Sequence, residues 1–208
     1  GSETFLNVFI FFLIFAGIIL DKMGVRFTAI LSGVVMLVGA TINWYAVTES
    51  FQGSGLDTWF TNNLNYIPGF DELGISPFYK GMPASAKFAA VGFMIFGCGV
   101  EMAGITVSRG IVKWFKGREM ALAMGSEMAL ARLGVASCMI FSPVFAKLGG
   151  NIDVSRSVAF GVILLFVALI MFIVYFFADK KLDAQTGEAE EKDDPFKLSD
   201  LGKIMSSM

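Results

Sequence analysis

The chain has 208 residues, of which 55% are hydrophobic and 16% are charged, and its formal net charge is −2. Soluble domains have about 45–50% apolar and about 25% charged residues, so this composition excludes an ordinary soluble protein. The sequence contains no histidine. This excludes histidine-ligated metals and histidine-based catalysis, and we expect no metal site and no cofactor.

The charged residues are clustered, and they leave five apolar stretches that could each form a membrane-spanning helix. These stretches cover residues 5–20, 27–47, 88–112, 119–146 and 157–178. A helix needs about 20 residues to cross the hydrocarbon core. The stretches are continuously apolar and do not alternate, which argues against a membrane β-barrel. The sequence therefore predicts an all-α, polytopic membrane protein.

Two segments are too polar or too rich in turn residues to lie in a bilayer. The connection over residues 48–87 contains several glycines and prolines, which favour turns, and we expect an outer loop with a short helix near residues 56–64. The segment over residues 179–208 includes the charged run "GEAEEKDD". It is predicted to be a cytoplasmic linker leading to a C-terminal half that the chain lacks.

The distribution of lysine and arginine predicts the orientation in the membrane. One side holds Lys22, Arg26, Arg109, Lys113, Lys116, Arg118, Lys180, Lys181, Lys192, Lys197 and Lys203, and the other holds Lys80, Lys87, Lys147 and Arg156. Cytoplasmic loops carry the excess of basic residues. We therefore expect the C-terminus in the cytoplasm and, in a bacterium, a location in the inner membrane.

The turn between the first two stretches carries a recognisable pattern. The segment "GIILDKMGVR", from Gly17 to Arg26, resembles the G-x-L-x-D-R-x-G-x-R signature of the major facilitator superfamily. In that family the signature joins the second and third spans, and its acidic residue, here Asp21, would pair with Arg26 and with basic groups of the next cytoplasmic turn. Gly17 and Gly24 would let helix ends approach closely. A solvated turn that only sets topology is the alternative.

Two further segments carry the same resemblance. The segment "WFKGRE", which contains Arg118, resembles the turn between spans four and five, and "FGCGVEMAG" resembles the G-x-G-x-E element of span four. The combination is most similar to the branch that includes lysosomal dipeptide transporters. The resemblance implies spans two to six of the N-terminal half of a secondary transporter, with Asp21, Arg26, Gly17, Gly24 and Arg118 as a gate or latch.

Two charged residues lie inside the predicted spans. Glu101 precedes Lys116 by fifteen residues and Arg132 follows it by sixteen. If Lys116 marks the turn of a helical hairpin, both charges lie about 20 Å from that turn, near the middle of the bilayer. Charges at that depth cost at least about 2.5–3.5 kcal/mol each, so they are expected to face a cavity or a partner.

The two charges have two interpretations. Glu101 and Arg132 could form a structural ion pair. Alternatively, Arg132 binds a substrate carboxylate and Glu101 binds its ammonium group, which would suit a short peptide or another small zwitterion. Glu127, nearer the turn, is interpreted as a secondary site or a gate. Small residues of the same spans are predicted to allow close helix packing, namely Gly97, Gly99, Ala103, Gly104, Gly125, Ala129 and Gly134.

Alternatives to peptide transport remain at this point. An organic-anion symporter would depend mainly on Arg132, and a non-transporting membrane scaffold would use the loop over residues 48–87 as its contact surface. A membrane enzyme is disfavoured by the lack of histidine and of paired intramembrane aspartates. The expected partners are the lipid bilayer, a small-molecule substrate and the missing half of the transporter, with no nucleic acid.

Overall fold

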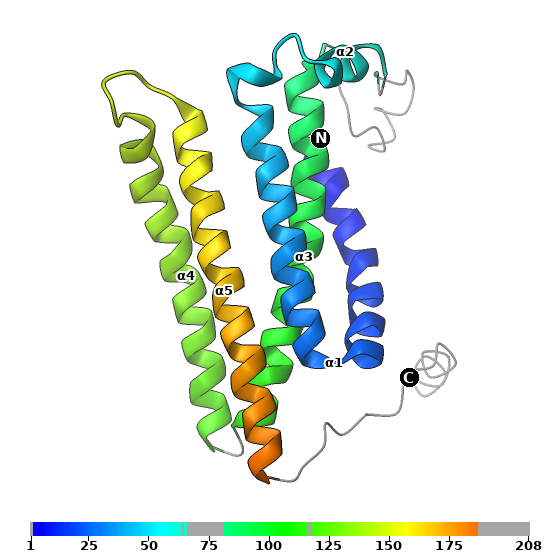
Figure 1. The fold of residues 1–208 in the computed structure, drawn as a ribbon, viewed down its shortest axis with the longest axis vertical. Helices are drawn as coiled ribbons and strands as arrows, with labels where there is room; N and C mark the ends of the chain where they lie inside the picture. The colour runs from blue at the N-terminus through cyan, green and yellow to red at the C-terminus, as the bar shows by residue number, and fades with distance from the viewer. Residues whose placement is uncertain (1, 64, 66–80, 116–117, 187–208) are drawn as a thin grey trace.

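The computed structural model describes residues 2–63, 65, 81–115 and 118–186, and it describes side chains for residues 16–63, 65, 81–115 and 119–185. In these ranges the chain forms helices and short loops, with no strand (Figure 1). The elements are α1 Ser2–Ala46, the 3-10 helix η1 Glu49–Phe51, α2 Gly55–Asn62, α3 Ala84–Trp114, α4 Arg118–Ala146 and α5 Val154–Thr186.

The protein is an all-α polytopic membrane protein. Within the described part, four helical stretches are long and apolar enough to cross a bilayer: Ala16–Ala46, Ala84–Trp114, Glu119–Ala146 and Val154–Gln185. They expose many large apolar side chains, and a lipid environment removes the cost of that exposure. The predicted stretch 5–20 lies in the first part of α1, where the backbone is helical and side chains before Ala16 are outside the described set.

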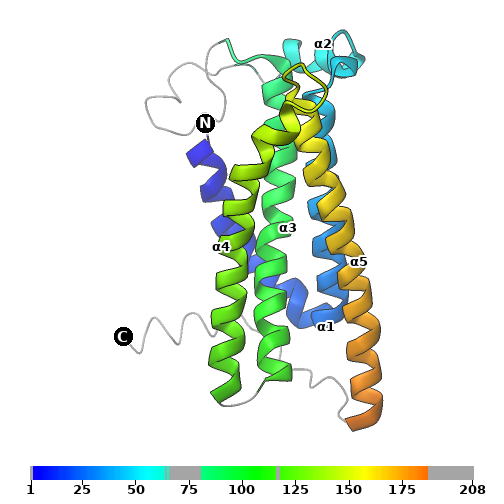
Figure 2. The same cartoon turned by 90° about the vertical axis from the view of Figure 1, so that its left-hand side faces the viewer.

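A break at Gly24 divides α1 into two arms that run in opposite directions (Figure 1). Gly24 has φ 80° and ψ 164°, a backbone conformation that residues with a Cβ rarely adopt. The break lies at the end of the bundle where α3 and α5 finish, which we call the Gly24 end. The opposite end carries α2 and is called the α2 end (Figure 2).

The second arm of α1 packs most closely against α3, and three glycines allow the contact. A Cβ on Gly39 would lie 2.4 Å from the backbone nitrogen of Phe96, and a Cβ on Gly92 would lie 2.7 Å from the side chain of Asn43. A Cβ on Gly99 would lie 2.7 Å from the backbone nitrogen of Met36. Glycine thus brings the two backbones together where a side chain would separate them, as is common between membrane helices.

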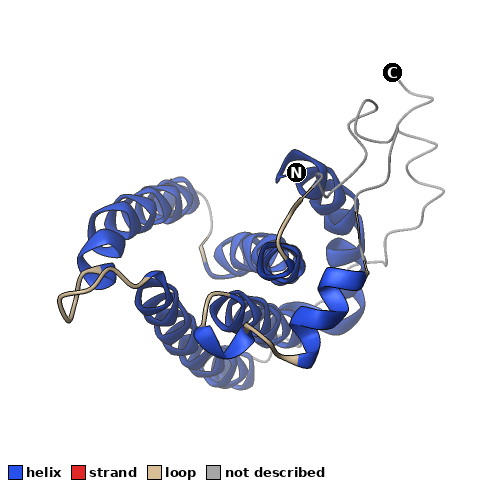
Figure 3. Ribbon diagram, turned by 90° about the horizontal axis from the view of Figure 1, so that it is seen from above, coloured by secondary structure: helices blue, strands red, loops and turns tan. Residues whose placement is uncertain are grey.

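The other helices pack around this pair less tightly. α5 contacts the second arm of α1, where a Cβ on Gly33 would lie 2.8 Å from the side chain of Leu169. α4 lies at one edge of the molecule and the first arm of α1 at another (Figure 3). Of the predicted packing glycines, Gly99 is confirmed, whereas a Cβ on Gly104, Gly125 or Gly134 would meet nothing within 4 Å. Among the described residues these three glycines have no neighbour within that distance, so close packing there stays a prediction.

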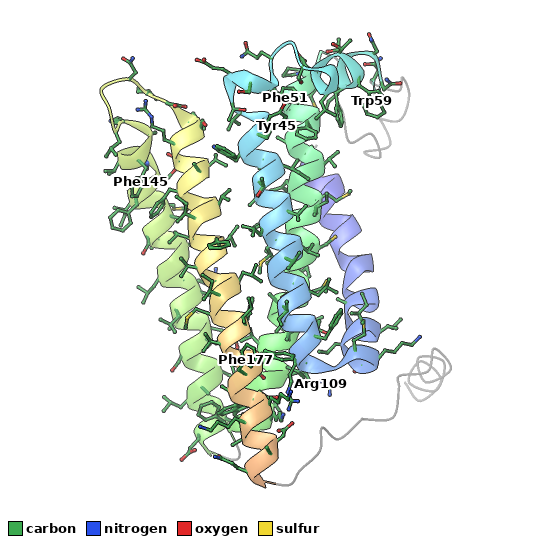
Figure 4. The ribbon with its side chains drawn as sticks, viewed as in Figure 1. Tyr45, Phe51, Trp59, Arg109, Phe145 and Phe177 are labelled. Carbon is green, nitrogen blue, oxygen red and sulfur yellow. The ribbon has the colours of Figure 1, made fainter. Side chains whose placement is uncertain are left out.

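The predicted loop over residues 48–87 contains a packed cap at the α2 end. Phe51 and Phe60 are buried there, and the aromatic rings of Tyr45 and Phe88 pack against Phe51. Figure 4 shows Tyr45 and Phe51 close together beside α2, with Trp59 on α2 itself. The short helix expected near residues 56–64 is α2, and residues 66–80 of the predicted loop lie outside the described ranges.

A buried lysine fastens this cap to α3. Lys87 is 4% exposed, and its Nζ donates to the carbonyl oxygens of Phe60 at 3.0 Å and Asn63 at 3.3 Å, and to Oδ1 of Asn65 at 3.0 Å. Two of these acceptors are carbonyls at the C-terminal end of α2, where the helix dipole favours a cation. The ammonium group therefore joins the last turn of α2 to the first turn of α3.

The glycine contact makes a direct prediction for stability. We expect Gly39→Ala to lower the free energy of unfolding by about 1–3 kcal/mol, because the added methyl group has no space between two backbones. The control is Gly161→Ala in α5, where a Cβ meets nothing within 4 Å and where alanine favours the helix by about 1 kcal/mol. Thermal unfolding of both variants in detergent measures the difference, and equal stability of the two would contradict the close contact.

Candidate functional site

Charged side chains from three helices converge at the Gly24 end. α1 contributes Arg26, two residues after the break. α3 contributes Lys113 and Trp114 from its last turn. α5 contributes Asp179, which lies directly after a long apolar run. The site therefore forms at the level where α1 is broken at Gly24, where α3 ends, and where α5 is about two turns from its end.

Asp179 is the centre of this cluster, and its side chain is 0% exposed. Arg26 donates from Nε to Oδ2 at 2.6 Å, and Lys113 donates from Nζ to both carboxylate oxygens, at 2.9 and 3.0 Å. The indole Nε1 of Trp114 donates to Oδ1 at 2.9 Å. A carboxylate has about four lone-pair sites, so these four hydrogen bonds fill its accepting capacity.

A second carboxylate completes the charge balance. Asp183 lies one turn after Asp179, on the same helix face. It accepts from Lys113 Nζ at 2.9 Å and forms a further ion pair with Arg26. Two carboxylates thus face two cations, and buried charges are stable only in such paired and hydrogen-bonded arrangements. We call these four residues and Trp114 the Asp179 cluster.

Asp21 belongs to a different and more exposed ion pair. Its Oδ1 accepts from Nη2 of Arg109 at 3.0 Å, and the two side chains are 16% and 43% exposed. Figure 4 shows Arg109 at the Gly24 end of the bundle. The expected pairing of Asp21 with Arg26 is absent from the described residues, because the break at Gly24 directs Arg26 towards α5 and leaves Asp21 beside α3.

An open cavity of about 490 Å³ lies along one face of α3, and Arg109 is part of its wall. The cavity is lined by Glu101, Gly104, Ile105, Ser108, Arg109 and Val112. Their spacing of three or four residues places most of them on one helix face. The wall of this cavity therefore contains one acidic residue, Glu101, and one basic residue, Arg109, at different heights along α3. Glu101 and Arg109 are eight residues apart, about 12 Å along the helix axis.

The glycine contact explains why Glu101 faces this cavity. At about 100° per residue, Glu101 lies about 160–180° around α3 from Gly92 and Gly99, which rest against α1. The glycine face is buried and the Glu101 face lines the cavity, with Glu101 itself half-buried. One helix thus packs through one side and presents a carboxylate on the other.

The other predicted substrate residue lies on α4. Arg132 is exposed, in a stretch of α4 whose residues from 128 to 141 are all exposed, and Glu127 is half-buried. In the part of the chain that the structure describes, Arg132 and Glu101 form no ion pair. The structure thus places Glu101 and Arg109 on one cavity wall and leaves Arg132 outside the lining of that cavity.

The remaining predicted latch residues are Gly24, Gly17 and Arg118. Gly24 has a positive φ, a backbone conformation that favours glycine. Gly17 does not mark a close approach, since a Cβ there would meet nothing within 4 Å. Arg118 begins α4, and its side chain lies outside the described set, as do residues 116 and 117.

The interpretation of residues 179–208 as a polar linker does not identify Asp179 and Asp183 as part of a site. The sequence nevertheless contains a signal for them. An aspartate that directly follows a long apolar run, with a second aspartate four residues later, lies at the level where Arg26 and Lys113 were already placed on one side of the membrane. Buried or interfacial basic residues need acidic partners at the same depth.

Comparison with known proteins gives one informative similarity. The chain is 28% identical over 126 residues to the lysosomal dipeptide transporter MFSD1 of Danio rerio, a member of the major facilitator superfamily. The match covers 57% of this chain and 27% of that relative. No protein-family model and no solved structure matches the chain. The similarity confirms the predicted resemblance to the superfamily.

The Asp179 cluster predicts a large and local effect on stability. We expect Asp179→Asn to lower the free energy of unfolding by about 3–5 kcal/mol, because it leaves Arg26 and Lys113 without their central counter-charge. The control is Asp153→Asn. Both side chains of the Asp153–Arg156 ion pair are 43% exposed, so its loss should lower the free energy of unfolding by less than about 1 kcal/mol. Denaturant unfolding in detergent compares the variants, and a loss of similar size in both would show that the cluster is no more than a surface contact.

Proposed function

We propose that this chain, a distant homologue of a major facilitator superfamily transporter, forms one helical bundle of a secondary transporter for short peptides or other small zwitterions. One observation carries the proposal. Glu101, a half-buried carboxylate inside a membrane span, lines an open cavity of about 490 Å³. The relative that is 28% identical over 126 residues of the chain is a dipeptide transporter by name. Ionisable groups inside membranes usually serve substrate or ion pathways.

In this proposal Glu101 binds the ammonium end of the substrate. A carboxylate at half the depth of the membrane attracts a cation strongly because little water competes with it. The carboxylate end of the substrate requires a guanidinium group, which binds it through two parallel hydrogen bonds. Arg132 on α4 is the residue we assign to this role. It becomes a cavity residue when α4 moves closer to α3, and Glu127 would act as a gate on the same helix.

The cycle would be alternating access, in which two bundles rock about a central site. It needs a second bundle on the far side of the cavity, which we assign to a C-terminal half or to another chain. The Gly24 end would face the cytoplasm in the orientation favoured by its basic residues. The Asp21–Arg109 pair is partly exposed, so it can break and re-form at low cost, as a latch must.

The folded cap weakens the scaffold alternative. Phe51 of η1 and Phe60 of α2 are buried against α3 and the end of α1, so they form part of this chain's own packing, whereas Leu56 and Trp59 of α2 are exposed. The organic-anion alternative is tested by the ligand experiment described below. Glu101 disfavours an anion because a carboxylate in the cavity repels one, whereas Arg109 in the same wall would attract one.

The substrate assignment predicts how ligand ends and residues match. In the full protein, a dipeptide should raise the unfolding temperature, and Glu101→Gln should abolish that rise. Blocking the amine of the dipeptide should have the same effect on the wild type as Glu101→Gln, and amidating its carboxylate should have the same effect as Arg132→Gln. Glu49→Gln, a change of the same kind on exposed η1, is the control and should retain the full response.

Each alternative outcome of this experiment has a defined meaning. If blocked dipeptides stabilise the wild type as well as free ones, the peptide assignment fails. If a dicarboxylate stabilises the wild type and Glu101→Gln strengthens its effect, the protein is an organic-anion transporter. A response lost in Arg109→Gln and kept in Arg132→Gln would transfer the carboxylate role to Arg109.

The latch makes a separate prediction. Asp21→Asn should change the free energy of unfolding by less than about 1 kcal/mol, because its ion pair is partly exposed, and it should slow substrate uptake into liposomes by the full protein severalfold. Asp153→Asn, at the opposite end of the bundle, is the control for uptake. Wild-type uptake by both Asp21→Asn and Arg109→Gln would leave the pair as a contact without a role in the cycle.

A further inference from the structure

A second cavity lies between α1, α3 and α5, away from the Glu101 face. Its volume is about 320 Å³. The rear wall is made of small buried side chains, Ala29 from α1 with Thr106 and Gly110 from α3, and the rim carries large apolar ones. An apolar cavity of about 150 Å³ already holds a benzene molecule. This space is about twice that size.

The wall of this cavity favours hydrocarbon over water. Thr106 donates its hydroxyl to the carbonyl oxygen of Met102 at 2.7 Å, and Trp114 donates its Nε1 to Asp179. A bound water needs two to four polar partners. These two donors are already used within the protein, the hydroxyl of Tyr175 is the third polar group of the lining, and the other lining residues are apolar. Hydrocarbon is therefore the occupant that matches most of this wall.

The position of the cavity identifies the source of that hydrocarbon. Its rim includes Met171, which is 62% exposed, and Trp114 and Phe115, which are 42% and 40% exposed. The rim thus opens on the outer surface of membrane-length helices, where acyl chains are the neighbouring molecules. Lys180 and Lys181 are exposed on α5, about 7.5–9 Å further along the helix than the cavity residue Tyr175, at the level where lipid phosphates lie.

We propose that this cavity binds one acyl chain of an anionic phospholipid from the leaflet at the Gly24 end, with the phosphate beside Lys181, which lies about 80° around α5 from the rim residue Met171. Trp114 connects the site to the Asp179 cluster, since its ring forms part of the rim while its Nε1 donates to Asp179. A bound chain holds that ring in place, so lipid occupancy strengthens the cluster. This inference concerns binding alone and does not depend on the proposed transport function.

Two substitutions close the cavity by different routes. Gly110→Leu fills the rear wall, where a Cβ would lie 3.1 Å from the hydroxyl oxygen of Tyr175. Met171→Trp covers the rim from an exposed position and leaves the packed interior unchanged. The matched controls are Gly134→Leu, at an open glycine of α4, and Ile163→Trp, at an exposed position two turns earlier on α5.

The experiment uses a phosphatidylglycerol with a photoreactive group in its acyl chain, added to the purified protein in detergent, with labelled peptides identified by mass spectrometry. We expect labelling within residues 106–115 and 171–175, reduced at least fivefold in Met171→Trp and in Gly110→Leu, and unchanged in both controls. Equal labelling of Met171→Trp and Ile163→Trp would overturn the proposal and indicate non-specific lipid around the protein. Should Gly110→Leu fail to fold, Met171→Trp still decides the outcome.

Two further measurements identify the kind of lipid that supplies the acyl chain. A photoreactive phosphatidylcholine and a photoreactive free fatty acid, at the same concentration, should label these peptides at least threefold less than the anionic phospholipid. Lys181→Gln should remove that preference. Equal labelling by the free fatty acid would overturn the assignment to a phospholipid.

Discussion

The close contact between the second arm of α1 and α3 determines how the rest of the bundle is organised. Gly39, Gly92 and Gly99 place two backbones within a distance that no side chain would allow, and this fixes the rotation of α3 about its own axis. Since the glycine face of α3 rests against the second arm of α1, the face with Glu101 must point away from that arm. The position of the intramembrane carboxylate thus follows from glycines that never touch it.

The Gly24 end contains two sets of ion pairs that differ in solvent exposure. The Asp179 cluster has a buried and fully hydrogen-bonded carboxylate at its centre and partly exposed side chains around it, and it joins α1, α3 and α5 as one unit. The Asp21–Arg109 pair lies at the surface beside it. Buried networks resist separation because each broken bond strands a charge, whereas surface pairs exchange with water easily. In the proposed transport cycle the first kind would keep the bundle rigid and the second would open.

The sequence is informative about the membrane class and the helices because both depend on local properties. Apolar length gives the spans, and the glycine at the charged turn gives the break in α1. Contacts between residues far apart in the chain do not depend on local properties, so the sequence does not predict them. Asp179 meets Arg26 across 153 positions of the chain, and no local pattern encodes that meeting. The same limit applies to Gly104, Gly125 and Gly134, since a small residue permits close packing but does not supply the neighbour.

The attachment of the cap through Lys87 has a practical consequence for imaging this protein. Helices embedded in a detergent micelle offer few features outside it by which particle images can be aligned. α2 stands at the end of the bundle (Figure 1), and the ammonium of Lys87 ties it to the first turn of α3. An antibody fragment raised against α2 would therefore hold a fixed orientation relative to the spans, and would serve as an alignment marker that reports the tilt of this bundle in each conformational state.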